Sequence, residues 1–245
     1  MRFVYSRSHR DPFILRSYFD KIILAPGTMI INQGNKDLKL LSMDMYEIGY
    51  RCKITPDITA DLEGFYSESK DYSDIFDRFV PGGDSLITIL NEYLNTNLRA
   101  VQIGISSNFE FKISNQIMCS IFGTIQKTDI NNFQPLLNSN PDSSTSFENK
   151  ATPGFYGGFN FNYMPNNKWN INLNSYYYSQ QTFRHLTGET KISQKLLLNS
   201  KIGYTIDNHA RIFFTVRNLL DDNKNEFAFA DKIGRQFFIG ADLSF

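Results

Sequence analysis

The sequence lacks a long hydrophobic run, has few cysteines and carries no net charge, and each feature excludes a class of protein. No stretch of about 18 apolar residues occurs, so we expect no transmembrane helix. The 25 basic residues are balanced by 25 acidic ones, which argues against a nucleic-acid partner held by bulk charge. Two cysteines, Cys52 and Cys119, do not make a disulfide framework, and we expect both to lie on apolar strand faces.

Motifs for catalysis, metal binding and cofactor binding are also missing. The histidines His9, His185 and His209 are isolated along the chain, and no nucleophile elbow or metalloprotease helix occurs. Asp61 and Glu63 lie two residues apart on one strand face, a spacing that acid–base chemistry can use, but a polar channel wall explains the pair better. We therefore predict that the protein is not an enzyme, with no catalytic residue, metal site or cofactor.

Aromatic residues and alternating patterns are abundant instead. Aromatics make up 15% of the chain, which is high for a soluble domain and fits the aromatic girdles of membrane barrels. Near the C-terminus, polar residues alternate with an apolar face, and Phe238 is the exception on the polar side. That apolar face consists of Phe237, Ile239, Ala241, Leu243 and Phe245. Such alternation suits a strand with lipid on one side and water on the other.

Period-two alternation recurs along the whole chain and predicts about ten strands. We expect them near residues 2–8, 43–54, 57–69, 85–112, 116–129, 154–164, 168–180, 192–204, 209–217 and 235–245, with 85–112 bent or interrupted. The connections alternate between short, Pro-, Asn- and Asp-containing turns and long loops at 9–42, 70–84, 130–153, 181–191 and 218–234. This rhythm predicts an all-β fold, an antiparallel transmembrane β-barrel segment with short periplasmic turns and long extracellular loops.

Two alternatives remain open at this point. A complete ten-stranded barrel, acting as a pore or a surface hydrolase, predicts pairing between residues 2–8 and 235–245. A soluble carbohydrate-binding β-sandwich predicts that the apolar strand faces pack together in a core.

Several local motifs follow one another in a characteristic order. They are residues 2–12, Gly34-Asn35-Lys36-Asp37-Leu38-Lys39, Tyr46-Glu47-Ile48-Gly49-Tyr50-Arg51, Asn95 to Gly104, Val216-Arg217-Asn218-Leu219-Leu220-Asp221 and Gly240 to Phe245. Their order and spacing resemble the C-terminal part of the barrel of a TonB-dependent outer-membrane receptor. The sequence departs from the family pattern in three places: the proline after Asn35 is absent, the Pro-Glu pair after Lys39 is absent, and Ser106 replaces a glutamate.

The resemblance implies energised uptake of a scarce nutrient, such as an iron–siderophore complex, haem, cobalamin or a glycan, across the outer membrane of a Gram-negative bacterium. Such receptors have about 22 strands around a plug. We therefore expect residues 1–245 to be the C-terminal portion of the barrel, with signal peptide, plug and N-terminal strands encoded upstream, and not to transport alone. The implied partners are the TonB system through the N-terminal part, the barrel-assembly machinery through the strand that ends at Phe245, the small-molecule nutrient and membrane lipid.

Candidate ligand-binding residues also follow from the resemblance, because long loops and the outer ends of lumen-facing strands contact the ligand in such receptors. They are Arg10, Arg16, Tyr176, Tyr178 and Arg184. Arginine can bind an anionic siderophore bidentately, and tyrosine can stack on an aromatic or sugar ring. The competing interpretation for each residue is a solvated loop charge or a ring of the aromatic girdle.

Overall fold

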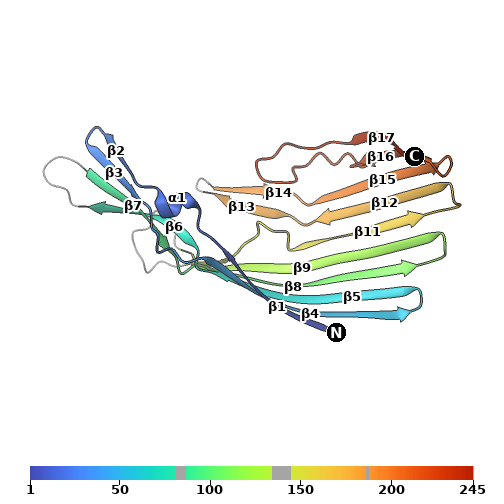
Figure 1. The fold of residues 1–245 in the computed structure, drawn as a ribbon, viewed down its shortest axis with the longest axis horizontal. Helices are drawn as coiled ribbons and strands as arrows, with labels where there is room; N and C mark the ends of the chain where they lie inside the picture. The colour runs from blue at the N-terminus through green and yellow to red at the C-terminus, as the bar shows by residue number, and fades with distance from the viewer. Residues whose placement is uncertain (81–86, 134–144, 186–187, 245) are drawn as a thin grey trace.

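The computed structural model describes residues 1–80, 87–133, 145–185 and 188–244. Most of its strands belong to one antiparallel sheet, called here the barrel sheet (Figure 1). Its strands are β1 (Arg2–Arg10), β4 (Leu41–Thr55), β5 (Ile58–Lys70), β8 (Arg99–Lys112), β9 (Ile117–Phe133), β10 (Thr145–Glu148), β11 (Phe155–Tyr163), β12 (Trp169–Tyr178), β15 (Lys195–Thr205), β16 (Ala210–Arg217) and β17 (Gln236–Leu243). Ten of them lie side by side in chain order, and the short β10 extends the sheet beside β9. The predicted all-β fold is confirmed.

Side-chain oxygens close the short turns between successive strands. Ser114 Oγ accepts the backbone N–H groups of Gln116 and Ile117 at 3.1 Å each, and Asp207 Oδ1 does the same for His209 and Ala210 at 2.8 and 2.9 Å. These local bonds favour a tight reversal over continued extension. Figure 1 shows all short turns at one end of the barrel sheet and all long connections at the other, as the loop lengths predict.

The predicted strand 85–112 is interrupted, and its described part forms two strands in different sheets. β7 (Ile87–Asn95) belongs to a four-stranded accessory sheet, whereas β8 returns to the barrel sheet at Arg99. The Thr96 N–H donates to the Tyr72 carbonyl at 2.7 Å and joins the two ends of this connection where the sheets part. Apolar residues alternate through both strands, so periodicity alone does not reveal the break.

The accessory sheet draws on two long connections. Its order is β2-β3-β7-β6, where the remaining strands are β2 (Lys21–Ala25), β3 (Thr28–Gln33) and β6 (Ser73–Val80). A short helix, α1 (Ile14–Tyr18), precedes it, and a separate hairpin joins β13 (Gln181–His185) to β14 (Gly188–Ile192). No helix in the described part of the chain is long and apolar enough to cross a membrane.

The two faces of the barrel sheet differ in chemistry, and the apolar face is not covered. In β17 the residues Phe237, Ile239 and Leu243 are 61%, 86% and 64% exposed, on the face predicted to be apolar. Cys52 and Cys119 are free thiols on the same face. Across the described ranges no large side chain is fully buried. A sandwich core is therefore absent from this part of the molecule, which excludes the soluble β-sandwich.

The barrel sheet is open, with β1 and β17 as its two edges. Figure 1 shows the N- and C-termini at opposite edges of the curved sheet. Arg2–Arg10 and Gln236–Leu243, both fully described, do not pair with each other. The closed ten-stranded barrel is therefore not the observed arrangement. Phe245, the predicted assembly signal, lies outside the described residues.

Candidate functional site

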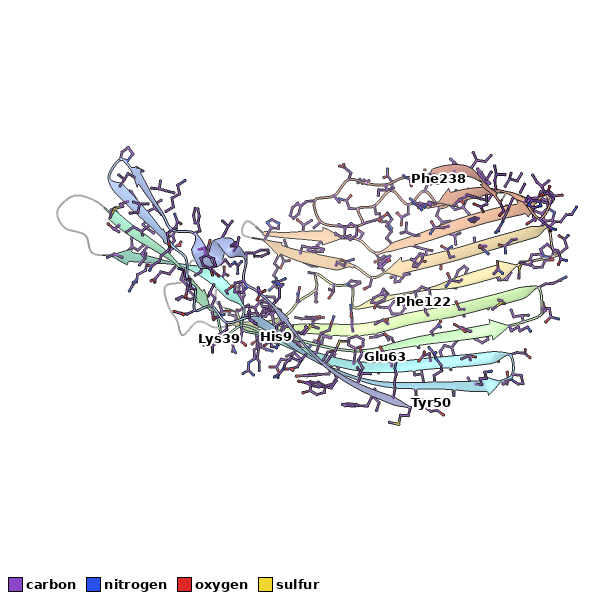
Figure 2. The ribbon with its side chains drawn as sticks, viewed as in Figure 1. His9, Lys39, Tyr50, Glu63, Phe122 and Phe238 are labelled. Atoms are coloured by element: carbon purple, nitrogen blue, oxygen red, sulfur yellow. The ribbon has the colours of Figure 1, made fainter. Side chains whose placement is uncertain are left out.

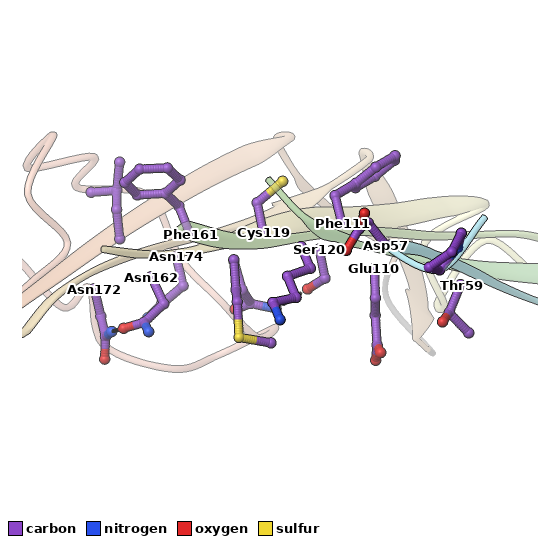
Figure 3. Close-up of a pocket in the computed structure, with 15 residues that line it drawn as sticks. Asp57, Thr59, Glu110, Phe111, Cys119, Ser120, Phe161, Asn162, Asn172 and Asn174 are labelled. Atoms are coloured by element: carbon purple, nitrogen blue, oxygen red, sulfur yellow. Dashed lines mark hydrogen bonds between the residues drawn. The ribbon is translucent and has the colours of Figure 1, made fainter. Parts of the chain in front are cut away.

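Polar side chains line the concave wall of the barrel sheet over β8, β9, β11 and β12. Figure 3 shows Glu110, Asn162 and Asn172 projecting from one face, while Phe111 and Phe161 project from the other. Residues of this wall line a hollow of about 550 Å³ near the short-turn end. Cross-strand hydrogen bonds link its polar groups, including Asn160 to Ser120 at 3.1 Å, Asn199 to Asn174 at 3.0 Å and Gln102 to Gln126 at 3.1 Å.

Two charged pairs join strands β1, β4 and β5 on the same face of the barrel sheet. Arg51 Nε donates to Asp61 Oδ2 at 2.8 Å, and Arg2 forms a salt bridge with Glu63. Both carboxylates therefore accept hydrogen bonds from a guanidinium group, Asp61 from the neighbouring strand β4 and Glu63 from β1, two strands away. This arrangement agrees with the polar-wall interpretation of Asp61 and Glu63.

Two of the predicted ligand residues come together where β1 leaves the barrel sheet. Arg10 and Arg16 line one pocket of about 150 Å³, called here the arginine pocket, with Phe13, Lys39 and Asp71 among its other residues. The guanidinium carbons of Arg10 and Arg16 lie 6.0 and 5.7 Å from the Phe13 ring centroid. Figure 2 shows Lys39 close to the point where the barrel sheet meets the accessory sheet.

Arg16 is held in place more firmly than Arg10. Its Nη1 donates to Ser73 Oγ at 2.9 Å and also to the Ser73 carbonyl, and its guanidinium carbon lies 5.9 Å from the Tyr93 ring centroid. Asp71 and Asp11 also line the pocket, so its three cations face two carboxylates. The arrangement can hold a small anionic group beside an aromatic ring.

The other predicted ligand residues lie elsewhere. Tyr176 and Tyr178 lie two residues apart on β12, on the same polar wall, and the Tyr176 ring centroid is 6.0 Å from that of Phe122. Arg184 lies on the β13–β14 hairpin, where its Nε donates to Glu189 Oε1 at 2.9 Å and its guanidinium covers the Phe147 ring at 4.5 Å. None of the contacts in the described part of the chain joins Arg184 to the arginine pocket.

Sequence reasoning missed a polar cluster that anchors the connection between β16 and β17. Lys195 is 3% exposed, and its Nζ donates to Glu226 Oε1 and to the Lys224 carbonyl, each at 3.0 Å. Asn218, 4% exposed, donates from Nδ2 to the carbonyls of Asp222 and Ile233. The motif that contains Asn218 could have drawn attention to it, but the pattern carries no sign of its partners. Among the described residues, no group of three or more His, Cys, Asp or Glu side chains could hold a metal ion.

The strand order, the two-faced sheet and the one-sided long loops are those of an outer-membrane receptor barrel. Residues 1–219 match the family described as TonB dependent receptor-like, beta-barrel. The chain belongs to the TonB-dependent receptor barrel family. Receptors of this family are transporters of the Gram-negative outer membrane, not enzymes, so the polar wall faces the lumen, the apolar face meets lipid and the long connections are extracellular.

Solved structures share this fold at low sequence identity. The siderophore receptor PirA from Acinetobacter baumannii matches with a TM-score of 0.73 and 14% identity, over 98% of this chain and 38% of that one. The ferric enterobactin receptor PfeA from Pseudomonas aeruginosa matches at 0.71 and 14% identity, over 99% and 38%. The copper transporter OprC matches at 0.64 and 14% identity, over 98% and 36%. The chain thus spans less than two fifths of each of these proteins. No curated protein matches it in sequence.

Proposed function

We propose that residues 1–245 form the C-terminal portion of a receptor barrel that takes up a scarce nutrient, such as an iron–siderophore complex, and that this portion does not transport alone. The open barrel sheet supports the second part. β1 and β17 each leave one edge unpaired. Unsatisfied backbone groups cost several kcal/mol each in lipid, so both edges need partner strands from the rest of a receptor.

The arginine pocket is the observation that carries the proposed ligand class. Three cations, Arg10, Arg16 and Lys39, line the pocket at the extracellular end of the barrel wall, and the two arginines lie over the Phe13 ring. Charge-assisted hydrogen bonds from guanidinium groups suit the oxygen anions that chelate iron. Tyr176 and Tyr178 add aromatic surface on the lumen wall, and Arg184 is the weakest candidate because Glu189 already pairs with it.

The test is ligand binding by the intact receptor that contains this chain. The double variant Arg10→Ala/Arg16→Ala should bind an anionic ferric siderophore at least about 100-fold more weakly, because it removes two charged hydrogen bonds that contribute roughly 1.5 kcal/mol or more each. Arg78→Ala is the matched control, since Arg78 is an arginine of the accessory sheet that pairs with Glu92. A panel of anionic and cationic siderophores and a copper salt separates the ligand classes. Unchanged binding in the double variant would contradict the assigned site.

The intact receptor would then have two protein partners. TonB supplies energy through the N-terminal part of the receptor, and the barrel-assembly machinery binds the C-terminal strand that ends at Phe245. Uptake should therefore stop when TonB is deleted, while ligand binding persists. Removal of the last strand should instead abolish insertion into the outer membrane. Uptake that continues without TonB would refute the energised mechanism.

A further inference from the structure

The lumen wall of the barrel sheet divides into sectors that differ in charge. On β9, β11 and β12 no lumen-facing position carries a charge across residues 120–128, 156–162 and 170–178, all of which the structure describes. Asparagines dominate the half of this strip that lies nearer the short turns. They are called here the amide lane and consist of Asn160, Asn162, Asn170, Asn172 and Asn174.

Charged groups border the amide lane on both sides. Glu110 of β8 occupies the same cross-strand row as Asn160, because both pair in register with Ser120 of β9. On the other side, Lys201 of β15 pairs in register with Asn172. The uncharged strip is therefore three strands wide, which is roughly 14 Å at the usual spacing between strands.

The amides of the lane are hydrogen-bonded to neighbouring side chains of the same wall. Asn160 Nδ2 donates to Ser120 Oγ at 3.1 Å. Asn172 Nδ2 donates to Asn170 Oδ1 at 3.0 Å and also to Asn162 Oδ1. Each amide has two N–H donors and a carbonyl with two lone pairs, so part of its hydrogen-bonding capacity stays open to the lumen. The lane is therefore an ordered polar surface without a net charge.

The amide lane connects the predicted ligand residues with the short-turn end of the barrel sheet. Tyr176 and Tyr178 continue the face of the lane on β12 toward the extracellular end, and Tyr178 pairs in register with Tyr156 of β11. At the other end lies the hollow of about 550 Å³, which four of the five asparagines line and whose volume is typical of small-molecule sites. A continuous uncharged strip thus leads from aromatic rings, through amides, to the periplasmic turns.

A wall along which a charged ligand moves must bind the ligand weakly enough to release it. A charged position retains a ligand of opposite sign and repels one of the same sign, whereas amides offer hydrogen bonds without either effect. Wide receptor barrels have a plugged lumen, so only part of the wall can border the path. We propose that the transported ligand crosses the barrel along the amide lane. This path rests on the proposed function and adds to it the side of the barrel through which the ligand passes.

The first test is uptake of an anionic and a neutral ferric siderophore by cells that carry the intact receptor. Asn174→Asp places a negative charge in the lane, and the new carboxylate can still accept the hydrogen bond that Asn199 Nδ2 donates at 3.0 Å. Uptake of the anionic siderophore should fall about tenfold, because like charges roughly 10 Å apart repel by about that factor at an effective dielectric constant of about 20. Uptake of the neutral siderophore and extracellular binding of both should stay unchanged.

Thr215→Asp is the matched control, because it adds the same charge to the lumen wall on β16, two strands beyond the lane and in register with Lys201. It should leave uptake of both siderophores unchanged. Wild-type uptake of the anionic siderophore by Asn174→Asp would overturn the proposal. So would an equal loss in Thr215→Asp, or equal slowing of both siderophores by Asn174→Asp in a receptor that inserts normally.

A second measurement does not depend on the ligand and therefore separates the path from the proposed function. A Cys52→Ser/Cys119→Ser background removes the two lipid-facing thiols and then receives Asn160→Cys, Asn174→Cys or Thr215→Cys. A membrane-impermeant thiol reagent added outside the cells should label the two lane positions faster than Thr215→Cys. Equal or slower labelling of the lane would refute the path. A receptor that takes up no siderophore but is labelled in the expected order would refute only the proposed function.

Discussion

Asn218 should control the order of the connection between β16 and β17, and replacing it offers the sharpest test of the local structure. Its φ of 52° lies in the left-handed region, where asparagine is favoured over other non-glycine residues. Its Nδ2 donates to the Asp222 and Ile233 carbonyls at 3.2 and 3.0 Å, and its Oδ1 accepts the Asp222 N–H at 3.0 Å. One side chain therefore ties both ends of the connection to the end of β16.

The expected loss of free energy in Asn218→Ala follows from these contacts. Asn218→Ala removes three side-chain hydrogen bonds, at about 1 kcal/mol each, and adds about 1 kcal/mol of left-handed backbone strain. The free energy of opening the connection should fall by about 4 kcal/mol, which raises the open fraction about a thousandfold until opening is complete. Asn218→Gly loses the same hydrogen bonds without the strain, so its effect should be about fivefold smaller.

Trypsin cleavage after Lys224 in the intact, membrane-inserted receptor reports this opening, because cleavage tracks the open population when reclosing is fast. Asn223→Ala is the matched control, an identical change at an exposed position of the same connection. The cleavage rate should be the same in the wild type and in Asn223→Ala, higher in Asn218→Gly, and highest in Asn218→Ala. Equal cleavage rates for Asn218→Ala and wild type would refute the anchoring role of Asn218. Faster cleavage of Asn218→Gly than of Asn218→Ala would show that left-handed backbone strain does not contribute.

Three further predictions follow from packing, lipid contact and burial. Gly158→Ala should prevent assembly, because its Cβ would overlap the backbone carbonyl oxygen of Ser175 on β12. Gly64→Ala should be tolerated, because its Cβ would meet no atom nearer than 3.5 Å, and a heat-modifiability gel distinguishes the two variants. Ile239→Lys places a charge on the lipid face, at a residue that is 86% exposed, and should lower the free energy of unfolding by about 2–4 kcal/mol. Thr215→Lys places the same charge on the lumen face and should change this free energy little, and urea titration measures both. Lys195→Met should cost about 2 kcal/mol in the same titration, because it leaves a partly exposed Glu226 without its buried partner; no loss would contradict the anchoring role.

Most of the barrel sheet could be predicted from the sequence because lipid and water impose opposite demands on alternate residues. The last strand shows this most clearly, since Phe237 and Ile239 were expected on one face and lie there. The Pro, Asn and Asp residues of the short turns then indicated where each short connection lies. Both patterns depend only on residues that are close in sequence, so they can be recognised without knowledge of the fold.

The accessory sheet and half of the arginine pocket could not be predicted in this way. β3 pairs with β7 across more than 50 residues of chain, and no local pattern records that contact. Lys39 reaches Arg10 and Arg16 only because the intervening segment folds back, so its place in the pocket is a tertiary property. Arg184 is a different case, because Glu189 follows five residues later on a hairpin and neutralises it locally.

The parallel pairing of β3 with β7 has a consequence for the exchange of loops between receptors. Thr28–Gln33 comes from the connection after β1, and Ile87–Glu92 comes from the connection after β5, yet each supplies backbone partners to the other. A transplant of either connection alone would leave a strand without its neighbour. The two connections therefore form a single cassette, and recombination or engineering that alters specificity must move them together.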